Sequence, residues 1–383
     1  MATFEQTKVT MFVGFIAIFL AYCYSLLVLF AVRGWKLHDK AVGTEHSYPF
    51  CSVVIAARNE AESIRATVES LLAQNYPKDC YEILVIDDHS TDATKQILDG
   101  IAATSSNLRA FSAPDGIAGK KQALKHILQH ASGDFLLFTD ADCTLGENWI
   151  ETYIAYASTH KGNLYFGNIC PNITSKSSFV EKCAALDFIG ILGVQNGLAE
   201  IGLPFSCNGA NMCITKEFYK TNYKTNETFS SGDDVFLLHT AKQIDTNSIH
   251  FIQNKQATVG TNVPRTISSF FNQRCRWASK AGGYKDKVSI IVALIVYLYC
   301  FALTTACGFA CFGNKLAFVC FIFLFLVKLC IDSILFFTTR SHFNSASYIW
   351  LAVPFEFVYF FYITIVPIAS IFHTTKWKER TIN

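Results

Sequence analysis

The sequence predicts an α/β domain with a mostly parallel sheet, flanked by transmembrane helices. Between residues 45 and 262, short β-rich runs alternate with stretches of helical periodicity, which is the pattern of a parallel sheet covered by helices. Residues 8–33 and 288–373 are predominantly apolar over lengths that suit membrane spans. These observations predict a multi-pass integral membrane protein that carries one soluble domain.

The first apolar segment is interpreted as an N-terminal anchor. Residues 11–32 contain no charged side chain, and a helix of that length rises roughly 33 Å, enough to cross a hydrocarbon core of about 30 Å. A cleaved signal peptide is the alternative, but no small-residue cleavage site follows. Arg33, Lys36 and Lys40 come next, and basic flanks favour the cytosolic side. We therefore expect the α/β domain in the cytosol, at the plasma or inner membrane.

The soluble domain is expected to alternate strands with helices from its first residues. Buried strands are predicted at 50–56, 82–86 and 135–138, and helices at 60–74 and 120–130. Ligands of such sheets bind outside the carboxyl ends of the strands, and the acidic clusters of the sequence follow those ends. No GxGxxG follows the first strand and no GxxxxGK[ST] occurs. A dinucleotide-binding dehydrogenase and a P-loop NTPase both lose their main support.

Two acidic pairs follow predicted strands. Asp87 and Asp88 end the second strand, where they could accept hydrogen bonds from ribose hydroxyls or a base N–H, or cap the next helix. Asp140 and Asp142 follow the third strand, two positions apart and therefore pointing the same way. Such carboxylates can hold Mg²⁺ or Mn²⁺ against phosphate oxygens. A surface turn is the alternative reading of this pair.

Basic and acidic residues also mark two predicted helix starts. Lys120 opens a helix after a glycine-rich turn, a position that suits a phosphate, although a solvated charged face is the simpler explanation. Asp233 and Asp234 precede an apolar run. One of them could remove a proton from an acceptor hydroxyl, because like-charge repulsion helps raise one of the two pKa values; helix capping is the alternative.

The C-terminal third of the chain returns to the membrane. Residues 263–287 form an amphipathic, interfacial segment that contains Gln273, Arg276 and Trp277, and about three apolar spans follow within 288–373. Lys328 and Asp332 lie four residues apart on one helical face, either as a mutual pair or along a polar path. If the soluble domain is cytosolic, three later spans place the C-terminus on the opposite side of the membrane. The basic tail, residues 374–383, instead favours the cytosolic side, so one apolar segment could be re-entrant.

The composition excludes one class of partner. The 383 residues carry a formal net charge of only +2, whereas nucleic-acid binding requires a basic face or stripe. The 14 cysteines are scattered without a CxxC pair or zinc-ligand spacing. We expect no nucleic-acid partner, and free thiols in a reducing compartment.

Six motifs follow one another between residues 48 and 284: VVIAARNEAESI, VIDDHSTDAT, GKKQAL, FTDADC, SGDDVFLL and QRCRW. In this order they resemble the membrane-bound family 2 glycosyltransferases, which include cellulose synthases, hyaluronan synthases and ceramide glucosyltransferase. The resemblance implies a GT-A fold and a single displacement that inverts the anomeric centre. It also implies that Phe205 to Asn211 forms an acceptor-side loop.

The resemblance assigns the donor side of the site. Asp88 would contact a uridine-like nucleoside, with Ala57 and Glu60 in the same pocket. Lys120 would lie near the donor phosphates. The DxD pair would bind the diphosphate and the metal, Mg²⁺ or Mn²⁺, with Asp142 nearest the metal and Asp140 beside it.

The resemblance also assigns the acceptor side. Asp234 would be the catalytic base, although this chain has GDD where many synthases have ED, so Asp233 remains open. Gln273, Arg276 and Trp277 match QxxRW, the motif at the acceptor and diphosphate end.

These expectations combine into an inverting glycosyltransferase of glycolipid or envelope polysaccharide biosynthesis. It would move a sugar from a nucleotide-diphosphate donor, with a UDP-sugar favoured, to a membrane lipid, lipid-linked or polysaccharide acceptor. Few spans favour a single transfer, whereas QxxRW is common in processive enzymes. The alternatives are a processive polysaccharide synthase subunit, for which envelope-biosynthesis partner subunits would complete a channel, and a non-catalytic membrane scaffold that retains the fold.

Overall fold

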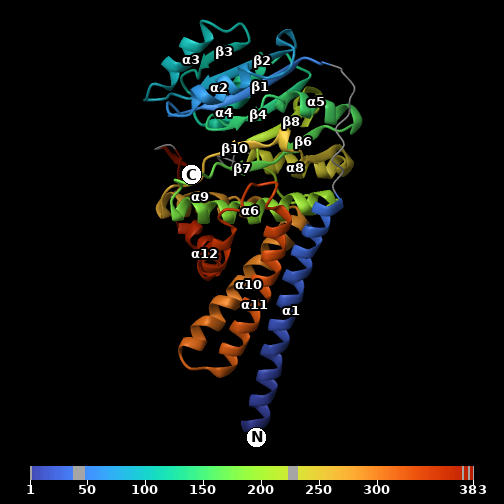
Figure 1. The fold of residues 1–383 in the computed structure, drawn as a ribbon, viewed down its shortest axis with the longest axis vertical. Coiled ribbons are helices and arrows are strands. Elements are labelled where there is room, and N and C mark those ends of the chain that lie inside the picture. The colour runs from blue at the N-terminus through green and yellow to red at the C-terminus, as the bar shows by residue number, and fades with distance from the viewer. Residues whose placement is uncertain (1, 38–47, 223–231, 373–374, 378–379, 383) are drawn as a thin grey trace. The chain divides into compact units, whose positions relative to one another are not determined.

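The computed structural model describes residues 2–37, 48–222, 232–372, 375–377 and 380–382 (Figure 1). The chain divides into two compact units, and each is described by itself. The sheet unit comprises residues 38–172, 206–263 and 376–383, and the helical unit comprises residues 1–37, 173–205 and 264–375.

The sheet unit is built on a seven-stranded sheet in the order β3-β2-β1-β4-β8-β6-β9. Its parallel part contains β3 (Leu108–Ser112), β2 (Tyr81–Asp87), β1 (Cys51–Ala57) and β4 (Phe135–Thr139). The remaining strands are β8 (Asn211–Thr215), which is antiparallel to both its neighbours, β6 (Leu164–Gly167) and β9 (Ile249–Ile252). The predicted α/β class and mostly parallel sheet are confirmed.

Apolar runs explain the central strands. Val53, Val54 and Ile55 of β1 are fully buried, as are the neighbouring side chains of β2, because helices cover both faces of a parallel sheet. Those helices are α2 (Ile64–Leu72), α3 (Thr94–Ala102), α4 (Lys120–Ile127), α5 (Trp149–Thr159), α7 (Lys216–Asn222) and α8 (Asp233–Ile244). A second, three-stranded sheet pairs β5 (Thr144–Leu145), β10 (Val259–Thr261) and β7 (Ile169–Pro171).

The helical unit holds four helices that are long and apolar enough to cross a membrane, counted over the described residues. They are α1 (Ala2–Leu37), α10 (Lys287–Cys311), α11 (Lys315–Thr339) and α12 (Ala352–Phe372), and their number matches the anchor plus three later spans. Two further helices belong to the unit, α6 (Phe179–Glu200) and α9 (Ile267–Ala278). The helix α9 lies inside the amphipathic segment expected at 263–287.

The helix α6 was not predicted. Its residues lie within the range 45–262, over which a single domain was expected. Residues 173–205 belong to the helical unit, where α6 lies across the C-terminal end of α1 (Figure 1). A Cβ on Gly197 of α6 would lie only 2.6 Å from the carbonyl carbon of Ala31, so the two backbones touch. Trp35 of α1 also donates from Nε1 to the Gly193 carbonyl, at 2.7 Å.

The charged pair predicted on one helical face is buried inside the helical unit. Lys328, which is 1% exposed, forms ion pairs with Asp332 and with Glu356 of α12, the latter at 2.7 Å. Tyr24 of α1 donates to Asp332 at 2.7 Å. The pair therefore lies inside the helical unit, where one buried polar cluster joins α1, α11 and α12. This agrees with the mutual pairing that was one of the two interpretations.

Near the C-terminus, β11 (Thr375–Trp377) and β12 (Arg380–Ile382) form a two-stranded sheet. Lys378 of the predicted basic tail lies outside the described residues.

Candidate active site

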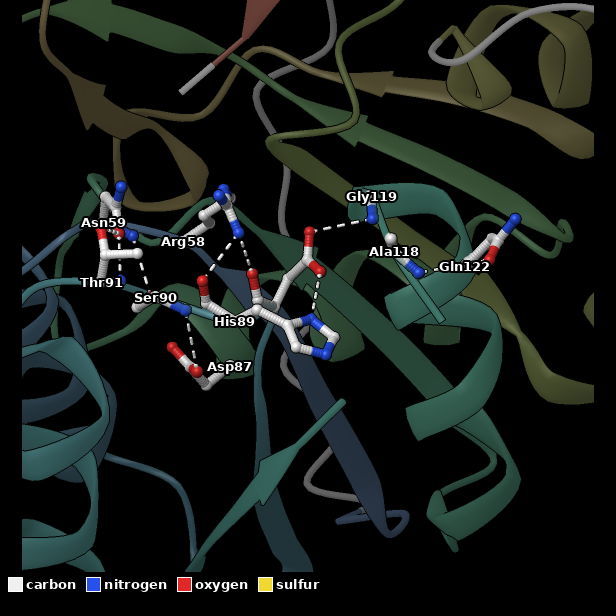
Figure 2. Close-up of polar contacts among 10 residues, drawn as sticks. Arg58, Asn59, Asp87, His89, Ser90, Thr91, Ala118, Gly119 and Gln122 are labelled. Atoms are coloured by element: carbon white, nitrogen blue, oxygen red, sulfur yellow. Dashed lines mark hydrogen bonds and ion pairs between the residues drawn. The ribbon is translucent and has the colours of Figure 1, made fainter. Parts of the chain in front are cut away.

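The loops that follow β1 and β2 interlock through their own polar groups (Figure 2). Arg58 donates from Nη1 to the carbonyl oxygens of Asp88 and His89, each at 2.7 Å. Asn59 donates its N–H to Ser90 and accepts from the N–H of Thr91, at 2.9 and 2.8 Å. Two adjacent strand ends are thereby fixed as one rigid edge, at the end of the sheet where ligands of parallel sheets bind.

Asp88 is held at the centre of this edge. It is fully buried, and its Oδ2 accepts from the N–H of Gly119 at 2.9 Å, while Nδ1 of His89 lies 3.2 Å from Oδ1. Gly119 has φ of 94°, a conformation that side chains with a Cβ rarely adopt. The carboxylate therefore ties the start of α4 to the end of β2. The adjacent Asp87 leaves Oδ1 buried and without a hydrogen-bond partner among the described residues.

The two other residues expected at the nucleoside pocket flank the same edge. Ala57 is 1% exposed, and its carbonyl accepts from the Asp88 N–H at 2.8 Å. Glu60 is half-buried and accepts from the Ser63 hydroxyl at 3.1 Å.

Two adjacent lysines connect three motifs of the sequence. Lys120 forms an ion pair with Asp140, and Lys121 forms one with Asp233 at 3.1 Å. Burial of Lys120 disfavours its charge, but attraction to Asp140, and then to Asp234, outweighs it and raises the pKa of Lys120 above its usual value. The GKK, DAD and GDD motifs thus lie together in the sheet unit, with the ammonium groups between the carboxylates.

The DAD turn is anchored from beneath by α2. The Thr67 hydroxyl donates to the carbonyl oxygens of Ala141 and Cys143, at 2.9 and 2.7 Å. Asp140 and Asp142 are both half-buried. Burial raises the pKa of the Cys143 thiol, and the negative charges of Asp140 and Asp142 raise it further. The turn is therefore a fixed, electronegative corner.

The acidic corner fits a hard divalent cation. Asp140 and Asp142 supply oxygen ligands of the kind that Mg²⁺ and Mn²⁺ prefer. No group of three or more His, Cys, Asp or Glu that could hold a metal occurs among the described residues.

Asp234 faces a different part of the unit from Asp233. Its Oδ2 accepts from the N–H of Gly209 at 2.8 Å, and its Oδ1 from its neighbour Val235 at 2.9 Å. A Cβ on Gly209 would lie 3.1 Å from the Asp234 Cβ, so a glycine at this position lets the loop backbone lie close to Asp234. Asp233 instead contacts Lys121. The structure therefore gives the two carboxylates distinct surroundings.

Sequence reasoning included Asn211 at the end of the acceptor-side loop but missed its buried hydrogen bonds, which it makes as the first residue of β8. It is fully buried and accepts from Trp149 Nε1 and the Tyr153 hydroxyl, each at 2.9 Å. Its amide donates to the carbonyls of Asn168 and Ala257, at 2.6 and 2.7 Å. All four bonds are non-local, so no sequence pattern signals them. Asn211 anchors the end of the loop that carries Gly209.

The QRCRW motif lies on α9 of the helical unit. Gln273, Arg276 and Trp277 are half-buried, whereas Arg274 between them is buried. Gln273 accepts from Arg274 Nη1 at 2.5 Å, and the Trp277 ring lies 5.9 Å from that of Phe188. Among the predicted site residues, these three are placed with the helices, and the others are placed with the sheet.

Comparisons with known proteins bear on the family and the fold. Residues 52–181 match the family described as Glycosyl transferase family 2. The chain is 32% identical over 248 residues to the beta-monoglucosyldiacylglycerol synthase of Nostoc sp., covering 62% of this chain and 50% of that protein. It is 26% identical over 261 residues to a hyaluronan synthase of Streptococcus pyogenes, covering 63% of this chain and 59% of that protein. The chain thus spans half the length of the first relative and 59% of the second.

The fold has a solved counterpart. A mannosyltransferase from Pyrobaculum calidifontis, in complex with GDP-Man and Mn²⁺, matches 93% of this chain and 99% of its own, with a TM-score of 0.59 and 17% identity. At that identity the match concerns the fold. Together the comparisons lead to one conclusion: residues 52–181 match Glycosyl transferase family 2, and the chain shares the fold of a GT-A glycosyltransferase and has, among the described residues, four helices long and apolar enough to cross a membrane.

Proposed function

We propose that the chain is a membrane-bound, inverting glycosyltransferase that moves one sugar from a nucleotide-diphosphate donor to a lipid or lipid-linked acceptor. The observation that carries this proposal is the convergence of Lys120, Asp140 and Asp234 at one edge of the sheet unit. A cation and a base within one corner are what a displacement at a sugar phosphate requires.

The donor would bind along the interlocked loops, and a UDP-sugar is the donor we favour. The nucleoside would lie against Asp88 and Asp87. Oδ1 of Asp87, which has no hydrogen-bond partner in the part of the chain that the structure describes, supplies an acceptor. The diphosphate would meet Lys120 at the start of α4. Asp140 and Asp142 would hold Mg²⁺ or Mn²⁺, which neutralises charge on the departing diphosphate. The structure of the mannosyltransferase with the same fold contains both a nucleotide sugar, GDP-Man, and Mn²⁺.

Asp234 would act as the base. As the acceptor oxygen bonds to the anomeric carbon and the bond to the diphosphate breaks, the hydroxyl proton would pass to the Asp234 carboxylate. Its contact with Gly209 aims it at the loop that resembles the acceptor side. Asp233 is the less suitable base, because Lys121 already pairs with it.

A membrane-located acceptor is supported by two observations. Four helices are long and apolar enough to cross a membrane, and a relative over 62% of this chain is named for glucosyl transfer to diacylglycerol. We place the sheet unit in the cytosol, where nucleotide sugars are made and where the basic residues after α1 favour it.

The decisive experiment uses the full chain in lipid nanodiscs. A panel of UDP-, GDP- and dTDP-sugars is offered with a lipid extract, and the lipid-soluble product is analysed by mass spectrometry. The proposal predicts that wild type adds one sugar and that EDTA abolishes transfer until Mg²⁺ or Mn²⁺ is restored. Asp142→Ala should reduce transfer at least a hundredfold. Equal background turnover by wild type and Asp142→Ala would overturn the enzyme proposal in favour of a non-catalytic scaffold.

The rival within the enzyme class is a processive polysaccharide synthase, favoured by the hyaluronan synthase relative. Chain-length analysis of a radiolabelled product separates the two. A single labelled glycolipid supports the proposal, whereas a ladder of long polymer overturns single transfer and leaves glycosyl transfer intact.

A further inference from the structure

One arginine of the QRCRW motif points away from solvent and into the helical unit. Arg274 is only 5% exposed. Its guanidinium lies over the ring of Phe270 at 4.5 Å and over that of Trp277 at 4.3 Å. Two residues of one helix thus enclose a cation between aromatic faces. An arginine cannot shed this charge, so it requires a buried anion.

That anion is Asp187 of α6, which is fully buried on its side chain. Arg274 donates from Nε to Asp187 Oδ2 at 2.6 Å, and Nη2 pairs with the same oxygen. The Tyr362 hydroxyl of α12 donates to the other oxygen, Oδ1. Burial raises the pKa of Asp187, and the guanidinium of Arg274 opposes that rise. One carboxylate therefore joins three helices of the unit.

The same guanidinium also reaches the motif residues beside it. Arg274 Nη1 donates to Gln273 Oε1 at 2.5 Å, and the Arg274 plane packs on Trp277. Fixing Arg274 therefore fixes the side chains of Gln273 and Trp277, as well as the rotation of α9 about its axis. Charge-assisted bonds are short and directional, so this contact specifies one orientation.

We propose that Asp187 is a positioning residue, which acts through Arg274 to hold Gln273 and Trp277 in the orientation needed for sugar transfer. The proposal rests on the proposed function for its kinetic test. The residues proposed to hold the nucleotide belong to the sheet unit, whereas Asp187 and its partners Arg274 and Tyr362 belong to the helical unit. In this proposal Gln273 and Trp277 act on the acceptor, so Asp187 should control turnover rather than the affinity for UDP.

Three variants in nanodiscs test the proposal. Asp187→Asn keeps the shape but removes the charge, and Arg274→Lys keeps the charge but loses the planar, forked donor set. Ser178→Ala removes the side-chain cap of α6, so it weakens the same helix without touching Arg274. Affinity is measured with UDP, and transfer with the sugar donor that wild type uses, per mole of monodisperse protein.

For Asp187→Asn and Arg274→Lys we expect kcat at least tenfold lower, with the dissociation constant for UDP within twofold of wild type. Ser178→Ala should retain the kcat of wild type. If Asp187→Asn lowered only the yield of folded protein and kept full kcat per folded molecule, its role would be merely structural and the proposal would fail.

A second readout does not depend on turnover. Acrylamide quenching of Trp277 is isolated by comparing each variant with its counterpart carrying Trp277→Phe. Release of the ring in Asp187→Asn should raise the Trp277 quenching constant at least twofold. If the Trp277 quenching constant is unchanged in Asp187→Asn, the positioning proposal fails, even if the wild type transfers no sugar. If the constant rises in Asp187→Asn but the wild type transfers no sugar, only the proposed function is refuted.

Discussion

The crossing of α1 and α6 gives the sharpest test of the helical unit. A Cβ added to Gly197 would lie 2.6 Å from the carbonyl carbon and 2.7 Å from the Cα of Ala31. Carbon atoms in contact sit about 3.5–4.0 Å apart, so the helices would have to separate by about 1 Å. Separation would also strain the bond from Trp35 to the Gly193 carbonyl, now 2.7 Å.

The cost of Gly197→Ala can be estimated from these two contacts. Overpacking typically costs about 1–3 kcal/mol and the lost hydrogen bond about 1 kcal/mol. The total of about 2–4 kcal/mol is reduced by the roughly 1 kcal/mol that alanine gains over glycine in a helix. The net cost of about 1–3 kcal/mol corresponds to a thermal midpoint lowered by roughly 2–12 °C for a unit of this size.

The assay is retention of the monodisperse peak in size-exclusion chromatography after heating in detergent. The matched control is Gly308→Ala in α10, where a Cβ would meet nothing within 4 Å and where alanine favours the helix by about 1 kcal/mol. Gly308→Ala should keep or raise the midpoint. If Gly197→Ala were as stable as that control, the close crossing of α1 and α6 would be wrong.

Further predictions concern buried polar groups. Lys328→Met should lower the free energy of unfolding by about 3–5 kcal/mol, because the carboxylates of Asp332 and Glu356 lose their cation. An unchanged thermal midpoint would contradict the buried cluster. Asn211→Ala should lower the free energy of unfolding by at least about 3 kcal/mol, because each buried partner left without its hydrogen bond costs about 1–3 kcal/mol. Denaturant unfolding of the sheet unit, followed by tryptophan fluorescence, measures this loss.

The sequence predicts the sheet unit where local patterns are strong. Strands β1 and β2 were expected within a residue of their observed ends, because a run of side chains buried on both faces must be continuously apolar. The acidic pairs were found because each follows such a strand. These features depend on neighbours along the chain, so they can be read from it.

The remaining features depend on distant contacts. The helix α6 escaped prediction because Asp187, Gln195 and Asn196 interrupt its apolar pattern, although all three are buried. The roles of Arg274 and Asn211 likewise arise from partners more than forty residues away. Sequence reasoning chose Gln273, Arg276 and Trp277 by resemblance, and it passed over the buried arginine between them.

The central claim is that the acidic corner of the sheet unit performs sugar transfer with Asp234 as its base. The most direct measurement compares Asp234→Asn with Asp233→Asn, for transfer of sugar and for binding of UDP, in nanodiscs with Mn²⁺. The account predicts that Asp234→Asn binds UDP like wild type and loses transfer by about 10²–10⁴-fold, the usual contribution of a general base. Asp233→Asn should retain most of the transfer activity. Retained transfer by Asp234→Asn, with loss in Asp233→Asn, would contradict the account.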